Sequence, residues 1–347
     1  MNRGIGMNWT VGIDLGAQGV RMSTKGRALV LRQSSACALA GEQILALGDE
    51  ARRMEGRAPR KVEVLYPMAS GSVGSERALR AWLRHMAQHS GTRSVRMLIA
   101  RPPQMSLSQM RHLSALALES GASACGLVRS DLAAALGAGL TLEDKKGALV
   151  VQVGAGSVSV TLMAALRTAV LYTLPYGVDR ADQAVQRLLR GKGLSVGPVT
   201  AESVKVSLAS VMTGASLEEP VAGLDVQTGF PGQRTVAAAE VAQCLSPITG
   251  PIPELVCRAL DQATPELLED LIDRGILLTG GGSQVYGLDK QIAEATGLSC
   301  RVAEDPAGCV ARGLEKLLDA SDDFQFLVQA HQTLLEKRLA GPLGGRA

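Results

Sequence analysis

The sequence VVQVGAGSVSV, at residues 150–160, changes in its middle from a strand pattern to a glycine turn and back. Apolar residues lead into Gly154-Ala155-Gly156 and small apolar residues then alternate, which is typical of a strand–turn–strand hairpin. Glycines in such a turn let the backbone approach a ligand closely, so that successive N–H groups can cradle a phosphate. The position before the turn where an acid would serve that chemistry holds Gln152. The stretch is therefore either a nucleotide-binding hairpin without its acid or a plain glycine turn.

The same pattern occurs near the N-terminus, in GIDLGAQGV at residues 12–20. In both places further strands and then helices follow, so the sequence predicts a duplicated α/β unit with a ligand cleft between its halves. A third glycine run, TGGGSQVYG at residues 279–287, lies between an apolar strand and a helical pattern. Such a loop puts backbone N–H groups at a helix N-terminus, where a phosphate binds well.

Helices are predicted wherever apolar residues recur at helical spacing. The clearest of them lie at residues 75–91, 106–122, 179–193 and 200–211. Ser106 and Thr200 are the expected N-caps of the second and fourth of these helices. Residues 214–235 are poor in helix formers and suit a small peripheral subdomain. The spacing of apolar residues after residue 318 predicts a last helix that caps the first domain.

Composition limits the classes of protein to which the chain can belong. Its 347 residues, 46% hydrophobic and 20% charged, are typical of a globular protein with two domains. Six scattered cysteines without a CxxC pair, and only four histidines, argue against a zinc site and favour a reducing compartment. A net charge of +3 does not indicate a nucleic-acid partner, and the absence of a long apolar segment predicts a cytoplasmic protein.

Basic residues are concentrated between residues 52 and 101, where only three glutamates oppose them. An ordinary solvated surface explains this pattern, and a face directed at an anionic membrane or an acidic partner is the alternative. At the N-terminus, Trp9 with Met1 and Met7 is a candidate for a weak membrane anchor, although a frayed end fits these residues better. A peripheral position at the inner face of the cytoplasmic membrane is thus a further expectation.

Four longer segments resemble the MreB family of bacterial actins. They are LALGDEARRMEGRAP (residues 45–59), YGVDRADQAV (176–185), VTAESVKVSLAS (199–210) and DRGILLTGGGSQVYGLDKQIAEATGLSCRVAEDP (273–306). The order of these motifs and the length of the last one make the resemblance specific, and it covers about residues 10–318.

The resemblance implies an actin-like fold: two duplicated RNase-H-like domains, an interdomain nucleotide cleft and two small peripheral subdomains. The implied boundaries are 1–32, 62–146 and 312–347 for subdomain IA, 33–61 for IB, 147–180 and 246–311 for IIA, and 181–245 for IIB. It also implies ATP with Mg²⁺ in the cleft, and self-association into membrane-associated filaments that set cell shape and position wall synthesis. Co-assembly with another MreB-type protein is a further implication.

The resemblance further implies which residues bind the cofactor. These are Asp14 and Gly16 at the first hairpin, Gly154, Gly156 and Ser157 at the second, Gly177 and Asp179 in the following turn, Glu202 and Lys205 toward the ribose and adenine, and Gly280, Gly281 and Gly282 beneath the α-phosphate and adenosine. Asp14 is also the implied metal-side residue, since Mg²⁺ keeps several waters and an acid can hold it through them. Glu202 and Lys205 are three residues apart and share one face of a helix, so both can meet one ligand.

The departures from the family pattern lie at the phosphates. The hydroxyls expected after Gly16 are missing, the acid of the second hairpin is Gln152, and the family's Glu-Glu-Pro run is Arg129-Ser130-Asp131. Because phosphoryl transfer depends on positioning and on metal-borne charge, we predict weak or absent hydrolysis. Asp131 is a candidate stand-in for the lost water-positioning glutamate.

Three alternatives remain open from the sequence. One is a cleft that is purely structural and binds no nucleotide. Another is a monomeric, non-polymerising pseudo-ATPase scaffold. The last is a small-molecule kinase of the same superfamily, which would need a catalytic acid facing a substrate hydroxyl, and Asp131 is the candidate for it.

Overall fold

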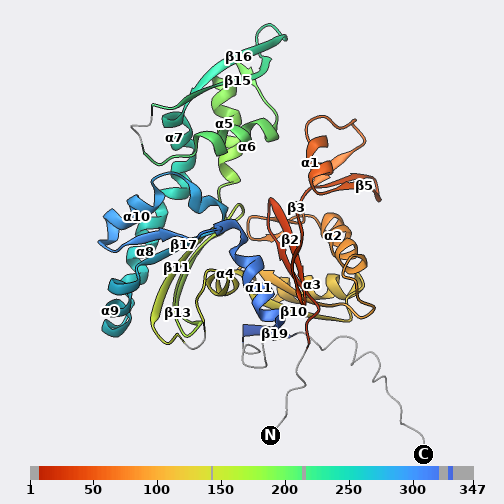
Figure 1. Ribbon diagram of the computed structural model, residues 1–347. Coiled ribbons are helices and arrows are strands. Elements are labelled where there is room, and N and C mark those ends of the chain that lie inside the picture. Colours follow the sequence, from red (N-terminus) through yellow and green to blue (C-terminus); the bar gives the residue numbers. More distant parts are fainter. Residues whose placement is uncertain (1–7, 142–143, 213–215, 320–326, 331–347) are drawn as a thin grey trace, which may run out of the picture.

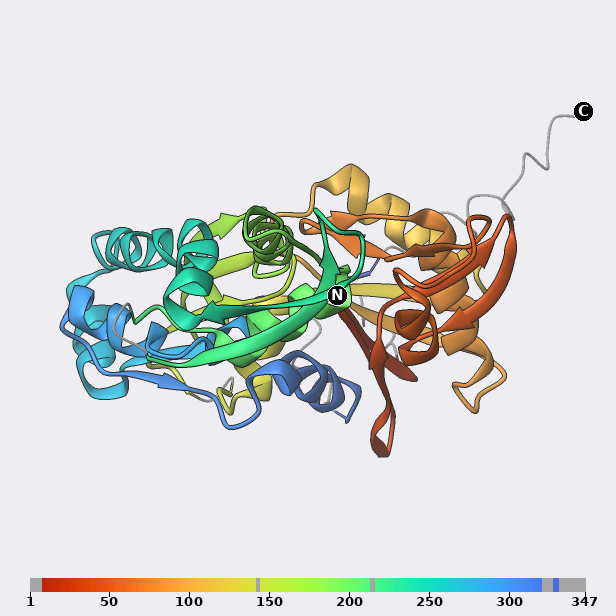
Figure 2. The ribbon, with the colours of Figure 1, turned by 90° about the horizontal axis from the view of Figure 1, so that it is seen from above.

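The computed structural model describes residues 8–141, 144–212, 216–319 and 327–330. The chain forms two halves, each built around a mixed β-sheet, with a smaller lobe on top of each half (Figure 1). The view from above shows the red-to-orange first half beside the green-to-blue second half (Figure 2).

The sheet of the first half has the strand order β19-β10-β9-β1-β2-β3. Its strands are β1 (Val11–Leu15), β2 (Gly19–Thr24), β3 (Arg27–Ser34), β9 (Arg96–Arg101), β10 (Ala124–Arg129) and β19 (Val328–Ala330). The first three form an antiparallel meander, while β9 and β10 continue parallel to β1. Strand β19 closes the sheet as an antiparallel partner of β10.

The sheet of the second half repeats this plan, in the order β13-β12-β11-β17-β18. Its strands are β11 (Gly147–Val153), β12 (Val158–Ala164), β13 (Arg167–Leu174), β17 (Ile276–Thr279) and β18 (Cys300–Val302). Again the first three are antiparallel and the last two are parallel to the first. The shared order confirms the predicted duplication.

Helices cover both sheets, and the two helices of the first half lie where the apolar periodicity predicted them. In the first half they are α2 (Glu76–Gln88) and α3 (Leu107–Glu119), and in the second half α7 (Ala238–Thr249), α8 (Pro251–Leu260), α9 (Pro265–Arg274) and α10 (Leu288–Thr296). Helix α2 buries Trp82 and Leu83 in the core of the first half. Ser106 caps α3 as predicted, in a reciprocal capping box with Gln109.

Two helices join the halves at the base of the molecule: α4 (Ser130–Gly137) and α11 (Cys309–Asp319). Their backbones touch at two glycines. A Cβ on Gly137 would lie 1.8 Å from the carbonyl oxygen of Cys309, and one on Gly313 would lie 1.8 Å from that of Ala133. Larger side chains at these positions would push the helices, and with them the two sheets, apart.

The two outer lobes stand above the sheets on opposite sides (Figure 1). The lobe of the first half contains β4 (Cys37–Ala40), β5 (Gln43–Leu47), β6 (Glu63–Leu65) and α1 (Asp49–Met54), with the hairpin β7 (Met68–Ala69) and β8 (Ser72–Val73) below it. The lobe of the second half contains α5 (Arg180–Gly191), β14 (Leu194–Ser195), α6 (Pro198–Leu208), β15 (Glu218–Asp225) and β16 (Pro231–Ala237). The subdomain boundaries implied by the resemblance stay predictions.

Three local predictions were wrong. Helix α6 begins at Pro198 with Gly197 as its N-cap, three residues before the expected N-cap Thr200, because proline suits the first helical position. Residues 328–330 form a strand, not a helix, since the open edge of β10 supplies hydrogen-bond partners. This strand does cover the first domain, while most of the predicted last helix lies outside the described residues. Trp9 is 7% exposed and packs against Gly126, so it is a core residue, and neither the favoured frayed end nor a membrane anchor describes it.

Candidate functional site

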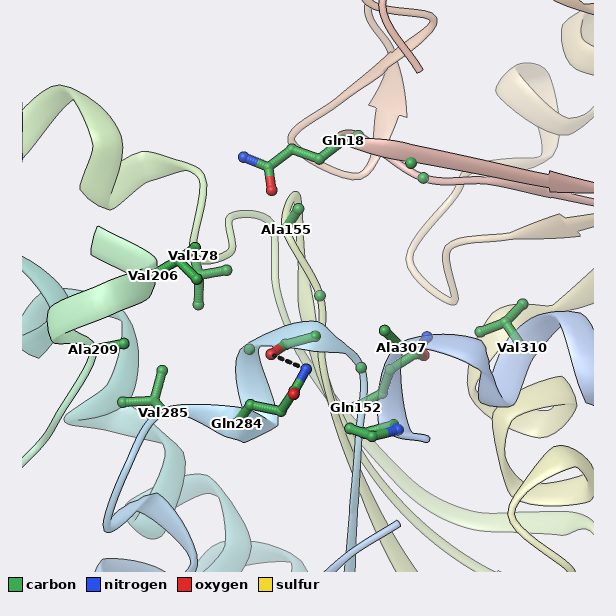
Figure 3. Close-up of a pocket in the computed structure, with 18 of the residues that line it drawn as sticks. Gln18, Gln152, Ala155, Val178, Val206, Ala209, Gln284, Val285, Ala307 and Val310 are labelled. Carbon is green, nitrogen blue, oxygen red and sulfur yellow. Dashed lines mark hydrogen bonds between the residues drawn. The ribbon is translucent and has the colours of Figure 1, made fainter. Parts of the chain in front are cut away.

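A cavity of about 560 Å³ lies between the two halves. Its lining comes from both hairpins, from the triple-glycine loop and from α6. The lining residues are Asp14, Gly16, Ala17, Gln18, Gly19, Arg21, Gln152, Gly154, Ala155, Val178, Lys205, Val206, Ala209, Leu245, Gly280, Gly281, Gly282, Gln284, Val285, Pro306, Ala307 and Val310. Figure 3 shows Val206, Ala209 and Val285 on one wall, with Gln18 and Ala155 above them. The cavity is large enough for a small organic ligand.

The two hairpins are built alike. The N–H of Gly16 donates to the carbonyl of Gly19 (2.8 Å), and the N–H of Gly154 donates to that of Ser157 (2.9 Å). A Cβ on Gly16 would lie 2.8 Å from the carbonyl oxygen of Gly19, so the turn requires glycine. Both turns therefore present backbone to the cavity, as a phosphate nest requires.

The tips of the hairpins meet across the cavity. A Cβ on Gly156 would lie 3.0 Å from the Cβ of Ala17, so Gly156 and the adjoining Ser157 sit where the two turns touch. Neither residue is among those lining the cavity. Their role in the described structure is to let the turns approach each other.

Gly177 and Asp179 contact the backbone of the turn in the second hairpin. A Cβ on Gly177 would lie 2.3 Å from the carbonyl oxygens of Gly154 and Ala155. The N–H of Asp179 donates to the carbonyl of Ala155 (3.0 Å). Burial, followed by the nearby Asp182, raises the pKa of Asp179 to about 6.

The triple-glycine loop forms the floor of the cavity. It connects β17 to the short helix η1 (Gly281–Gln284), and a second short helix, η2 (Pro306–Gly308), flanks it. Gly280 has φ +80°, and a Cβ there would lie 2.3 Å from the carbonyl oxygen of Val153. Gln284 donates back to the carbonyl of Gly281 (3.4 Å), as the dashed line in Figure 3 shows. All three glycines line the cavity.

The two residues of α6 that were predicted to bind the nucleotide, Glu202 and Lys205, have different contacts. Lys205 is buried, and its Nζ lies 2.7 Å from Asp182 Oδ1 and donates to the carbonyl of Val178 (3.2 Å). Glu202 instead forms an ion pair with Arg52 of α1, across the gap between the two lobes. Lys205 therefore lines the cavity, whereas Glu202 is held at the lobe contact.

The acidic side of the site differs from a magnesium site. Asp14 is paired with Arg21, whose Nη1 lies 3.4 Å from Asp14 Oδ2. Burial raises the pKa of Asp14, and the charge of Arg21 opposes that rise. The second hairpin offers only the amide of Gln152, whose Oε1 accepts a hydrogen bond from Ser130 Oγ (3.1 Å). Among the described residues no group of three or more acids, histidines or cysteines could hold a metal ion. Asp14, the acid of the phosphate end, is already paired with Arg21, so these side chains fit a divalent cation poorly.

Comparison with known proteins agrees with this fold and this arrangement of glycine loops. A family model for MreB/Mbl protein matches residues 8–325. The chain belongs to the MreB/Mbl family. It is 31% identical over 320 residues to the cell shape-determining protein Mbl of Bacillus subtilis, covering 90% of this chain and 96% of that protein. It is 32% identical over 324 residues to the cell shape-determining protein MreB of Escherichia coli K12, covering 89% and 93%.

Solved structures show the same fold. The crystal structure of MreB5 of Spiroplasma citri bound to AMPPNP has a TM-score of 0.80 and 24% identity, and covers 88% of this chain and 94% of that chain. The MamK double helical filament has a TM-score of 0.76 and 20% identity, and covers 90% and 99%. These similarities confirm the predicted actin-like fold. Through its membership of the MreB/Mbl family, the chain belongs among the cell shape-determining bacterial actins.

Asp131, the candidate catalytic residue, lies outside the cavity lining of this MreB/Mbl protein. It is fully buried, and its carboxylate accepts hydrogen bonds from Arg129 and from the hydroxyl of Thr161 (2.7 Å). These partners occupy the carboxylate in a structural network at the start of α4. Nothing in this arrangement directs Asp131 toward a phosphate or a water in the cavity.

Sequence reasoning missed Arg21 and the cross-cleft partners. Arg21 lies opposite Asp14 in the β1–β2 register, so the alternation of the hairpin could have placed it on the cavity face. Gln18, which follows the first glycine of the first hairpin, donates from its Nε2 to Asp182 Oδ2 across the cleft (3.2 Å). No local signal links Gln18 or Arg52 to partners that are more than 140 residues away along the chain.

Proposed function

We propose that this MreB/Mbl chain is a filament subunit that binds ATP in the interdomain cavity and hydrolyses it slowly or not at all. The observation that carries the proposal is the convergence of three glycine loops, from both halves, on one cavity of about 560 Å³. The backbone of both hairpins faces the position of a polyphosphate. In other proteins of this fold, two structures of MreB5 hold AMPPNP and ADP.

The opposite end of the cavity suits a purine. Val206, Ala209, Leu245 and Val285 supply apolar surface there, and Lys205 and Gln284 supply polar groups at its margin. A mostly apolar wall with a few polar groups is the usual composition of a small-molecule site. The base would lie against this wall, with the phosphates toward the hairpins.

Slow or absent hydrolysis follows from the groups near the phosphate end. Gln152 replaces an acid there, and the hydroxyl of Ser130, which lies in the run that corresponds to the family's Glu-Glu-Pro, donates a hydrogen bond to Gln152. Asp131 is occupied by Arg129 and Thr161. An enzyme that positions neither a metal nor a water loses most of the stabilisation that phosphoryl transfer needs.

Self-association into filaments, co-assembly with another MreB-type protein and contact with an anionic membrane surface complete the proposal. The predicted basic face gives limited support to membrane contact, because Arg101 is buried and Arg52 forms an ion pair with Glu202 between the lobes. In the described part of the chain, no helix has both the length and the hydropathy needed to cross a bilayer. The expected location is the cytoplasm, at the inner face of the membrane.

Five measurements test the proposal. Calorimetric titration with ATP should show binding, and phosphate release should stay near background. Light scattering and electron microscopy should show polymers, and anionic liposomes should carry the protein upward in a flotation gradient. A protein that stays monomeric at high concentration would favour the scaffold alternative, and phosphate transfer to a small molecule would favour the kinase alternative.

A further inference from the structure

The cavity carries the cationic side chain of Arg21 next to Asp14, the acid that the family resemblance assigns to the metal side. Arg21 is on β2, directly opposite Asp14 on β1. Because side chains alternate along a strand, Arg21 and Gly19 share the face that points into the cavity. The side chains of Arg21 and Asp14 are 15% and 13% exposed, so their charges are largely shielded from solvent.

The guanidinium of Arg21 has hydrogen-bonding capacity left for a ligand. Its single hydrogen bond within the described residues runs from Nη1 to Asp14 at 3.4 Å, which is long for a charged pair. The buried Nε has no hydrogen-bond partner in the described part of the chain. A guanidinium offers five donors in a planar fork that matches two phosphate oxygens.

The charges of the phosphate end also balance without a metal. Asp14 contributes one negative charge and Arg21 one positive charge, while Gln152 is neutral. Lys205 and Asp182 form a second balanced pair at the margin. The bound phosphates add negative charge of their own, and the Arg21 guanidinium is the positive group of the phosphate end that can contact them.

We propose that the cavity binds the phosphates of a nucleoside di- or triphosphate without requiring a divalent cation, with Arg21 as the group that contacts the phosphate oxygens. This inference rests on the proposed nucleotide binding and goes beyond it by assigning the counter-charge. Asp14 then acts as the residue that positions the Arg21 guanidinium.

Calorimetric titration of the full chain with ATP, in excess magnesium chloride and in excess EDTA, tests the inference. For the unaltered chain the two dissociation constants should differ by less than about threefold. Arg21→Met should weaken ATP binding in EDTA by about 10- to 100-fold, the range expected for a lost charged hydrogen bond, and Arg21→Lys should restore part of it. Adenosine, which has no phosphates, should bind all three proteins equally.

Arg32→Met is the matched control, because Arg32 is the register partner of Arg21 on β3 but is exposed and does not line the cavity. This variant should bind ATP like the unaltered chain. Loss of ATP binding by the unaltered chain in EDTA would overturn the inference and leave the proposed function standing. Unchanged binding by a folded Arg21→Met variant would also overturn it. Failure to bind ATP under both conditions would remove the proposed function itself.

Discussion

The ion pair between Arg52 and Glu202 should hold the two lobes together. Arg52 also contacts Glu55 and the hydroxyl of Tyr66, which orient its guanidinium toward the opposite lobe. Glu202 comes from α6 of the other half, so the pair spans the entrance between the lobes. Substituting Arg52→Met or Glu202→Gln should therefore favour an open arrangement.

The size of this effect follows from burial. The side chains of Arg52 and Glu202 are 20% and 25% exposed. An exposed ion pair contributes about 0.2–1 kcal/mol to stability, and this partly buried pair should contribute more than that but less than a fully buried one. We expect a coupling free energy of about 1–2 kcal/mol, which changes the ratio of open to closed molecules by about 5- to 30-fold.

Hydrogen exchange read by mass spectrometry measures this change at the two glycine hairpins. Each single variant should exchange about 5- to 30-fold faster there, and the double variant should be no faster than either single one. Arg53→Met, at an exposed neighbouring position on the same helix, is the control and should leave exchange unchanged. The reasoning fails if the two substitutions are additive. A loss of ATP affinity in Glu202→Gln but not in Arg52→Met would instead assign Glu202 to the ribose.

Three further substitutions test the backbone and charge arrangement. Gly280→Ala combines a positive φ with a clash against the carbonyl of Val153, so urea titration should show a loss of about 2–4 kcal/mol and calorimetry a loss of ATP binding. Gly313→Ala meets the carbonyl of Ala133 at 1.8 Å and should lower the midpoint of thermal unfolding by more than about 5 °C, whereas a shift within error would contradict the tight helix crossing. Burial raises the pKa of Asp179 to about 6, above its unfolded value of 3.8. Ionising Asp179 in the folded protein therefore costs free energy, and the free energy of unfolding falls as the pH rises from about 4 to 6. Asp179→Asn should thus stabilise the protein by about 1–3 kcal/mol at pH 7.5 and by little at pH 4, and an equal effect at both would refute this assignment.

The sequence predicted the structure well at positions where the backbone conformation allows only one residue type, glycine. Glycines at residues 16, 154 and 280 predicted three close turns, and their duplicated context predicted the two matching sheets. It was less informative about side chains that depend on distant partners. The family resemblance and their spacing assigned Glu202 and Lys205 to one ligand, but tertiary contacts direct Glu202 toward Arg52 instead. Local preference likewise suggested a helix at residues 328–330, where the free edge of β10 selects a strand.

That short strand has a consequence for assembly. By pairing with β10, β19 becomes the edge strand of the sheet, and its three residues present a shorter row of free N–H and C=O groups to a neighbouring molecule than the six residues of β10 would. The few residues of β19 thus help to separate ordered polymerisation from aggregation.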